Sequence, residues 1–574
     1  ELSWRGQSFA VDGPFKLAGR EMTFDSVVVT GRETHVTMQG KWGPEGLAAS
    51  LKGHIDPGLP GRMAGRTVRA SGKALVDVHV TVADGQIGAN GNVNMDDVVF
   101  AVPGFIRKTK GVQSRAAVRF TRKRTGEIVV DEISGNLDTI NLRASGRISD
   151  EGRIDSRVTL RAKDTGKAAS LFSLGEDVRG GEVSLDLTVN DLRFPVTKLP
   201  WVVGSASMRK GFMKVPGIPK VLANIDLTAG FRGHEFDVTV SGLKTGESVL
   251  KTASLKVTGF ERPKFDLLVS MDRLKMADFG GGKEFKLESM GKDGVLARSS
   301  GNLSLRAKEV SFGSIPARDL EVKAFMTDRK INVSDMKLRV FDGEMDMKGM
   351  LDLSGRVPSL YTNGRMTRVR AGLFMAALGG TSQEISGEAF ITGTLKTEGR
   401  TMKDFKANLG GDTAVYSRDG VIKRWKLLSK IFALLNVYDL VRGKIDFGKD
   451  GLAYNKTGAS FTINKGVYHT SNFLLDSPSM VITGTGDIDI NKETITGTLE
   501  VSPLVALDRT IDKIPVLRSI LKNKNKGFLY VTYNISGSFD DPDISTNYVG
   551  TVGTKSLEIL RNILVFPREV FEKK

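Results

Sequence analysis

The chain has 574 residues, 40% of them hydrophobic, and its 83 Lys and Arg outnumber its 66 Asp and Glu to give a net charge of +17. It contains no cysteine, which excludes disulfides, thiolate nucleophiles and Cys-ligated metals. The positive charge favours anionic partners such as nucleic acid, acidic headgroups or lipopolysaccharide. The sequence has no run of about 18 apolar residues, and it opens strand-like without Met, so we expect any membrane anchor to lie upstream.

Apolar and polar residues alternate along much of the chain, and this period of two predicts β-strands with one apolar and one polar face. The clearest cases in chain order are "FDLLVSM", "MKLRV" with the strand after its Asp342–Gly343 turn, "ISGEAFITGTL", and the hairpin "VITGTGDIDI" to "ETITGTLEV". We predict that their apolar positions line one surface: Phe265, Leu267, Val269, Met271, Leu338, Val340, Met345, Met347, Ile391, Leu395, Ile482, Ile488, Ile490, Ile495, Leu499 and Val501.

Several of these segments resemble copies of one unit. The stretch that begins at Ser314 resembles the one that begins at Gly217, and weaker copies begin near Phe15, Ala117 and Ala459. The spacing is irregular, at roughly 100 residues, which is longer than most solenoid repeats but follows the same logic. We therefore expect an elongated array of repeated units rather than separate globules.

Helices are expected in few places. Residues 421–440, 506–521 and 554–566 have amphipathic patterns with basic residues nearby. Such helices either pack as lids against a sheet or lie on a membrane surface.

The stretch "GDIDINKETITG" has the acidic spacing of a calcium loop at Asp487, Asp489 and Asn491. A calcium loop needs Gly at its sixth position and Glu at its twelfth, and here those positions are Lys492 and Thr498. The five histidines do not cluster at metal-ligand spacing. We therefore expect no metal and no cofactor.

The sequence also argues against catalysis and nucleic-acid binding. It has no G-x-S-x-G elbow, and "FGGGKEFK" lacks phosphate-loop spacing. The basic stretches "FIRKTKG" and "RFTRKRTG" have few aromatic residues beside them for stacking on bases. A charged sheet edge that discourages aggregation explains them as well. We expect neither an enzyme nor a nucleic-acid binder.

An apolar sheet face must be covered, and few helices are predicted to cover it. Either the sheet packs on itself as a sandwich, or it curls into a trough that lipid acyl chains cover. Periodicity leaves both alternatives open.

Residues 412–545 carry a family resemblance. The helix "LLSKIFALLNV", the series "NFLLDSP" to "GDIDI", the motif "KIPVL" and the closing "VTYNISGSFDDPDI" are similar to the C-terminal region of the AsmA-like family, which includes TamB and YhdP. The resemblance implies periplasmic envelope proteins of Gram-negative bacteria, anchored to the inner membrane by an N-terminal segment that this chain lacks.

For the fold, the resemblance implies a mainly β protein: an elongated, curved antiparallel sheet of repeated units that forms an apolar groove, with a few short amphipathic helices. We expect groove units over 1–410, an AsmA-like region over 411–550 and a terminal helix with a basic tail over 551–574. The implied function is bridge-like transfer of phospholipid between inner and outer membrane. The implied partners are phospholipids, both membranes and envelope membrane proteins. A non-transporting scaffold that assists outer-membrane protein assembly is the alternative.

Overall fold

The structure is a computed structural model that describes residues 2–551, apart from 5–6, 32, 59–68, 103–105, 165–177, 194–199, 215–217, 260–261, 280–297, 379–381, 383, 424–450, 504–528 and 539–540. The chain divides into two compact units, residues 1–270 and 271–574. Each unit is described by itself.

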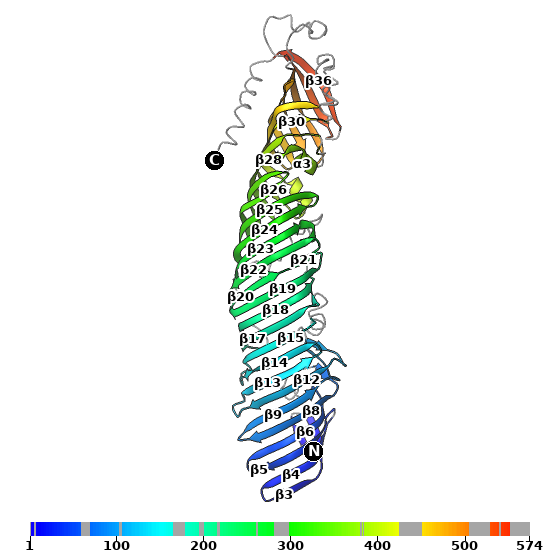
Figure 1. Cartoon of the computed structure of the whole chain (residues 1–574), viewed down its shortest axis with the longest axis vertical. Coiled ribbons are helices and arrows are strands. Elements are labelled where there is room, and N and C mark those ends of the chain that lie inside the picture. Colours follow the sequence, from blue (N-terminus) through cyan, green and yellow to red (C-terminus); the bar gives the residue numbers. More distant parts are fainter. Residues whose placement is uncertain are drawn as a thin grey trace. The chain divides into compact units, whose positions relative to one another are not determined.

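Unit 1 is built almost entirely of antiparallel strands that follow one another in sequence order (Figure 1). Nearly every strand pairs with the next one along the chain, as a meander does. The strands are β1 (Leu2–Trp4), β2 (Gln7–Asp12), β3 (Phe15–Ala18), β4 (Glu21–Thr30), β5 (His35–Gly43), β6 (Gly46–Ile55), β8 (Ala74–Ala83), β9 (Gln86–Asn94), β12 (Ser114–Arg122), β13 (Ile128–Leu137), β14 (Ile140–Ile148), β15 (Ile154–Ala162), β16 (Val178–Arg179), β17 (Glu182–Leu192), β18 (Trp201–Met213), β19 (Leu222–Gly233), β20 (Glu235–Ser241), β21 (Lys244–Thr245), β22 (Ser248–Thr258) and β23 (Lys264–Lys275), the last of which continues into unit 2.

A second, small sheet in unit 1 consists of β7 (Arg69–Ser71), β10 (Val99–Val102) and β11 (Ile106–Lys108). Lys108 is fully buried here, and its Nζ donates hydrogen bonds to the carbonyl oxygens of Asp96 at 3.2 Å and Val98 at 2.7 Å. Burial lowers the pKa of Lys108, while the nearby carboxylates of Asp96 and Asp97 oppose this shift. The ammonium thus joins the ends of β9 and β10.

Unit 2 continues the same antiparallel meander, and each strand from β24 to β36 pairs with the next. Three short helical segments accompany these strands. The elements are η2 (Met276–Phe279), β24 (Ser300–Phe312), β25 (Ile315–Thr327), β26 (Lys330–Val340), β27 (Gly343–Asp352), β28 (Ser359–Arg370), α3 (Ala371–Ala377), β29 (Glu388–Glu398), α4 (Met402–Ala407), β30 (Gly410–Ile422), β31 (Leu452–Asn464), β32 (Val467–Asp476), β33 (Met480–Asp489), β34 (Thr494–Pro503), β35 (Leu529–Gly537) and β36 (Pro542–Thr551).

The alternation in the sequence becomes two chemically distinct sheet faces, which we call the apolar face and the polar face. In β8, Val76, Val78 and Val80 are at least partly buried, whereas Asp77 and His79 between them are exposed. The predicted mainly β, antiparallel fold is therefore confirmed. The resemblance between the segments at Gly217 and Ser314 also has a structural counterpart, because β19, β20 and β22 form the same three-stranded antiparallel order as β25, β26 and β27.

Local irregularities keep the apolar residues on one face. Between β26 and β27 the register shifts from Val333 to Met336, so that Ser334 and Asp335 of β26 together lie opposite the single residue Lys348 of β27. Such a bulge lets Val333 and Met336, three positions apart, point to the same side of the sheet.

The three predicted helices lie wholly or mainly in residues outside the described ranges. The described part of the chain has α3 and α4 instead, and α4 begins with a capping box in which Thr401 and Asp404 bond to each other's backbone N–H. In that part, no helix is long and apolar enough to cross a membrane. The predicted domain boundaries at 410/411 and 550/551 stay predictions.

Candidate functional site

The apolar face of unit 2 carries its side chains in cross-strand rows. Leu338 lies opposite Met345, Met345 opposite Met366, Met366 opposite Ile391, and Ile391 opposite Val415. Residues directly opposite each other on antiparallel strands have Cβ atoms about 4.5–5.5 Å apart. The row therefore forms a continuous apolar strip across β26 to β30, and three of the predicted groove residues lie in it.

The neighbouring rows on this face continue the strip. Met336 lies opposite Met347, and Leu395 of β29 lies opposite Thr362 of β28. Glycines such as Gly364, which lies opposite Met347, have no side chain and therefore form shallow depressions between the large side chains. No residue of these rows is charged, so the face offers mainly dispersion and hydrophobic contact, without a charged group that would fix a ligand at one place.

The polar face of the same strands is held by ion pairs. Arg339 lies opposite Glu344, and Lys337 lies opposite Asp346, whose carboxylate is 3.3 Å from the Arg365 guanidinium. These groups are well exposed, so each pair contributes little to stability. Their charges favour hydration of the polar face, whereas contact of the apolar face with water is unfavourable.

Burial separates the apolar face of unit 2 into two regions. Met345, Met347, Ile391 and Leu395 are only partly buried by protein. The cluster toward β30–β35 is different, because its side chains are 0–8% exposed: Ile422, Leu452, Tyr454, Leu475, Met480, Ile482, Leu499, Val501, Val531, Tyr533 and Ile535. We call these residues the packed core of unit 2.

The predicted groove residues are distributed over both regions. Ile482, Leu499 and Val501 belong to the packed core, with Ile495 packed against it. Leu338 and Val340 are 4% and 6% exposed at the margin of the strip. Ile488 lies opposite Ile495, and Ile490 follows β33, its N–H bonded to the Gly466 carbonyl oxygen. Whether any of them contacts lipid stays a prediction.

Unit 1 has an apolar face of the same kind. Val78, Val80 and Val82 of β8 lie opposite Gly91, Ala89 and Ile87 of β9, and the three valines are partly buried. At the N-terminal strands this face is more open, with Phe15, Leu17 and Trp42 being 64%, 69% and 55% exposed. The predicted residues of β23 alternate as expected, since Met271 is 6% and Leu268 58% exposed.

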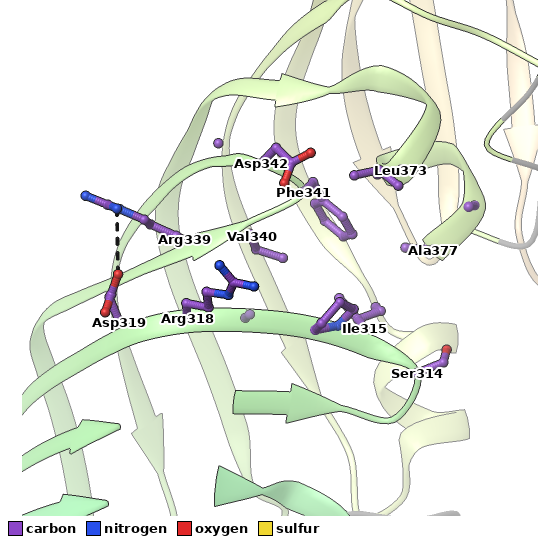
Figure 2. A pocket seen from close by; sticks show the side chains of 14 residues that line it. Ser314, Ile315, Arg318, Asp319, Arg339, Val340, Phe341, Asp342, Leu373 and Ala377 are labelled. Atoms are coloured by element: carbon purple, nitrogen blue, oxygen red, sulfur yellow. Dashed lines mark ion pairs between the residues drawn. The ribbon is translucent and has the colours of Figure 1, made fainter. Parts of the chain in front are cut away.

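A hollow of about 540 Å³ lies beside α3 in unit 2, at the margin of the apolar face (Figure 2). Its apolar lining comes from Ile315 at the start of β25, Val340 at the end of β26, Phe341 in the following turn, and Leu373 and Ala377 of α3. Phe341 meets Phe374 of α3 edge to face, with ring centroids 5.9 Å apart. The volume falls within the roughly 300–1,000 Å³ of small-molecule sites.

The four charged residues that line this hollow differ in their pairing. Arg339 points away from the hollow to Asp319, at 3.8 Å (Figure 2). Asp342 pairs with Arg370 at 2.7 Å. Arg318 also lines the hollow, and among the described residues it has no ion-pair partner. An apolar hollow with a guanidinium at its edge suits an amphipathic anion.

The sequence analysis did not indicate this hollow or the helix α3 beside it. No spacing rule brings residues 314–319 beside α3, because their contact depends on the register of four strands. In the described part of the chain, no three His, Cys, Asp or Glu side chains gather as a metal site would require. Asp487 and Asp489 lie on the polar face, where Asp487 bonds to His469.

Comparison with known proteins gives one match. The model of the family described as "YhdP protein" matches residues 14–544. No curated protein and no solved structure matches the chain.

Proposed function

The chain belongs to the YhdP family, which is envelope-associated, and from that premise we propose that it transfers phospholipid between the inner and outer membranes. In this proposal the protein is periplasmic, is anchored to the inner membrane, and carries out no catalytic step. Its partners are the phospholipids, the two membranes and envelope membrane proteins.

The observation that supports this proposal is the difference in burial along one apolar face. Large side chains such as Met345, Met347 and Ile391 are left partly exposed, while equivalent positions in the packed core are covered completely. Continuous apolar surface on a soluble domain marks a site for another molecule. Acyl chains match it, since they need no hydrogen-bond partner.

Acyl chains can move along the apolar strip because the hydrophobic effect is non-directional. Each CH₂ group that leaves water for the face gains about 0.8 kcal/mol, wherever along the strip it lies. A chain can therefore shift by one row without losing a specific contact. The headgroup stays in water at the margin of the sheet, where Arg318 beside the α3 hollow can pair with a lipid phosphate.

Neighbouring residues of β27 give a matched test. A photoreactive amino acid is placed at Met347, on the apolar face, or at Lys348, which is exposed on the opposite face of the same strand. In cells we expect crosslinking to phospholipid from position 347 and not from 348. Equal lipid capture at both positions would contradict the proposal. Capture at neither would favour the alternative, a scaffold that assists outer-membrane protein assembly without transport.

A further inference from the structure

The polar face of unit 2 carries a row of polar side chains across six strands, β28 to β33. Each member lies opposite the next, and the row runs Asn363, Thr394, Asp412, Thr462, His469 and Asp487. Asn363 Nδ2 donates to Thr394 Oγ1 at 2.9 Å, Thr462 Oγ1 donates to Asp412 Oδ1 at 3.0 Å, and His469 Nδ1 lies 2.8 Å from Asp487 Oδ1. These bonds orient the side chains before any ligand arrives.

The sheet is hollowed at this row. A depression of about 380 Å³ is lined by the first five members together with small or polar residues of the adjoining positions, among them Thr392, Ala414, Ser460, Ser471 and Asn472. No Lys or Arg lines it, in a chain that has 83 of them. The lining contains hydroxyl, amide and imidazole groups and the Asp412 carboxylate, which disfavours an anion, although Lys348, which lies opposite Asn363, is at the edge of the depression. The lining therefore suits an uncharged ligand.

Several polar atoms of the depression keep unused hydrogen-bonding capacity. Asn472 Oδ1 accepts from the Ser460 N–H at 2.9 Å, so its amide NH₂ remains as a donor. Asp412 uses one carboxylate oxygen for Thr462, and the other remains as an acceptor. The Ser460 Oγ is buried and has no hydrogen-bond partner in the described structure.

An aromatic pair lies two residues further along the central strands. Phe390 lies two residues before Thr392 in β29, Tyr416 lies two residues after Ala414 in β30, and the two rings face the same side with centroids 6.2 Å apart. The Arg418 guanidinium lies over the Phe390 ring, 5.3 Å from its centroid. Aromatic rings beside hydroxyl and amide groups offer an apolar surface next to polar contacts. Sugar rings have the same two characters, with C–H faces and hydroxyl edges.

We propose that this depression binds an uncharged oligosaccharide. The donors and acceptors of Asn363, Asp412, His469 and Asn472 contact its hydroxyl groups, and the Phe390–Tyr416 pair stacks on an adjacent ring. The site is on the opposite face of the sheet from the apolar strip, so it is independent of lipid transfer.

The test is titration calorimetry of the full chain with chitotetraose and maltotetraose, supported by an array of uncharged and anionic oligosaccharides. We expect saturable binding of an uncharged oligosaccharide that Asp412→Ala and Asn363→Ala each weaken at least tenfold. Asn332→Ala, an exposed amide on the polar face of β26, is the matched control and should bind like the unchanged chain. Thermal melts establish that each variant is folded.

Absence of binding to every uncharged oligosaccharide, or binding that both site variants leave unchanged, would overturn the proposal. A preference for anionic saccharides would overturn it as well, because the Asp412 carboxylate that lines the depression would repel them. Lipid crosslinking from position 347 is unaffected by any of these outcomes, so the two proposals fail separately.

Discussion

Met347 and Val501 occupy positions of the same type, an apolar residue between polar neighbours on a strand, but protein covers them differently. Val501 is 0% exposed in the packed core, whereas Met347 is partly buried on the apolar strip. Val501→Asp should lower the free energy of unfolding by at least about 4 kcal/mol, since it buries an unpaired charge. Met347→Asp should lower it by about 1 kcal/mol and should reduce lipid retention. Urea denaturation and lipid extraction measure the two effects.

The reverse pattern would contradict this account. If Met347→Asp unfolds the chain as Val501→Asp does, the strip is part of a packed core and the sheet covers its own apolar face. Met347→Leu is the matched control, because it keeps volume and hydrophobicity and should change stability by less than about 1.5 kcal/mol.

Asp489 has a structural role that its calcium-like spacing concealed. Its Oδ1 accepts hydrogen bonds from the N–H groups of Asn491 at 2.9 Å and Lys492 at 3.1 Å, which closes the turn between β33 and β34. The bond from Lys492, followed by that from Asn491, holds the pKa of Asp489 below its ordinary value of 3.8. Its stabilising contribution is therefore present above the unfolded pKa and is lost as the pH falls through the folded one.

Asp489→Asn should remove this dependence, because the amide oxygen still accepts the two bonds but does not titrate. We expect the free energy of unfolding to fall less between pH 5 and pH 3 in the variant than in the unchanged chain. Denaturation at both pH values measures it. If the free energy of unfolding falls by the same amount in the variant and in the unchanged chain, the ionisation of Asp489 does not contribute to the pH dependence of stability.

At the scale of the element, glycines determine how closely neighbouring strands can approach. Gly204 of β18 has a φ of +138°, and a Cβ there would collide with the Asp186 carbonyl oxygen of β17. Gly204→Ala should cost more than about 3 kcal/mol, from the strained backbone and the clash together. Gly152, in a turn of unit 1, has a φ of +80° and open space around it. Gly152→Ala should cost only about 1 kcal/mol, and thermal melts compare the two variants. Equal costs would mean that the close approach at Gly204 is not structurally required.

The elements differ in how far the sequence predicts them. The turn around Asn491 and Lys492 and the faces of β33 and β34 follow from the period of two, and the structure confirms them. The helix α4 was missed although "TMKD" has the spacing of a capping box, because its six residues are too few for a hydrophobic period. The bulge at Ser334 and Asp335 depends on the partner strand, which periodicity does not identify.

The candidate site, too, is only partly predictable from the sequence. Alternation places Met347 and Ile482 on apolar faces equally well, since each lies in a segment where apolar or glycine positions alternate with other positions that are mostly polar. Their difference in burial arises because β30–β35 bring large side chains such as Leu475 and Tyr533 together over Ile482. This clustering of side chains depends on the tertiary structure, which the alternation in the sequence does not reveal. The polar row from Asn363 to Asp487 is likewise visible only once six strands are in register.

At the scale of the whole molecule, the match over residues 14–544 confirms the resemblance to the AsmA-like envelope proteins and extends it beyond residues 412–545. Both units repeat the same design, an antiparallel meander with one apolar and one charged face. A repeated apolar face offers many equivalent positions for acyl chains, and one chain should therefore hold several lipid molecules.

Native mass spectrometry of the purified chain, with lipid extraction from the same preparation, tests this claim most directly. We predict a series of masses separated by one phospholipid, with more than one lipid per chain, and a decrease of the series in Met347→Asp. A chain that carries no phospholipid in native spectra and yields none on extraction would contradict the account.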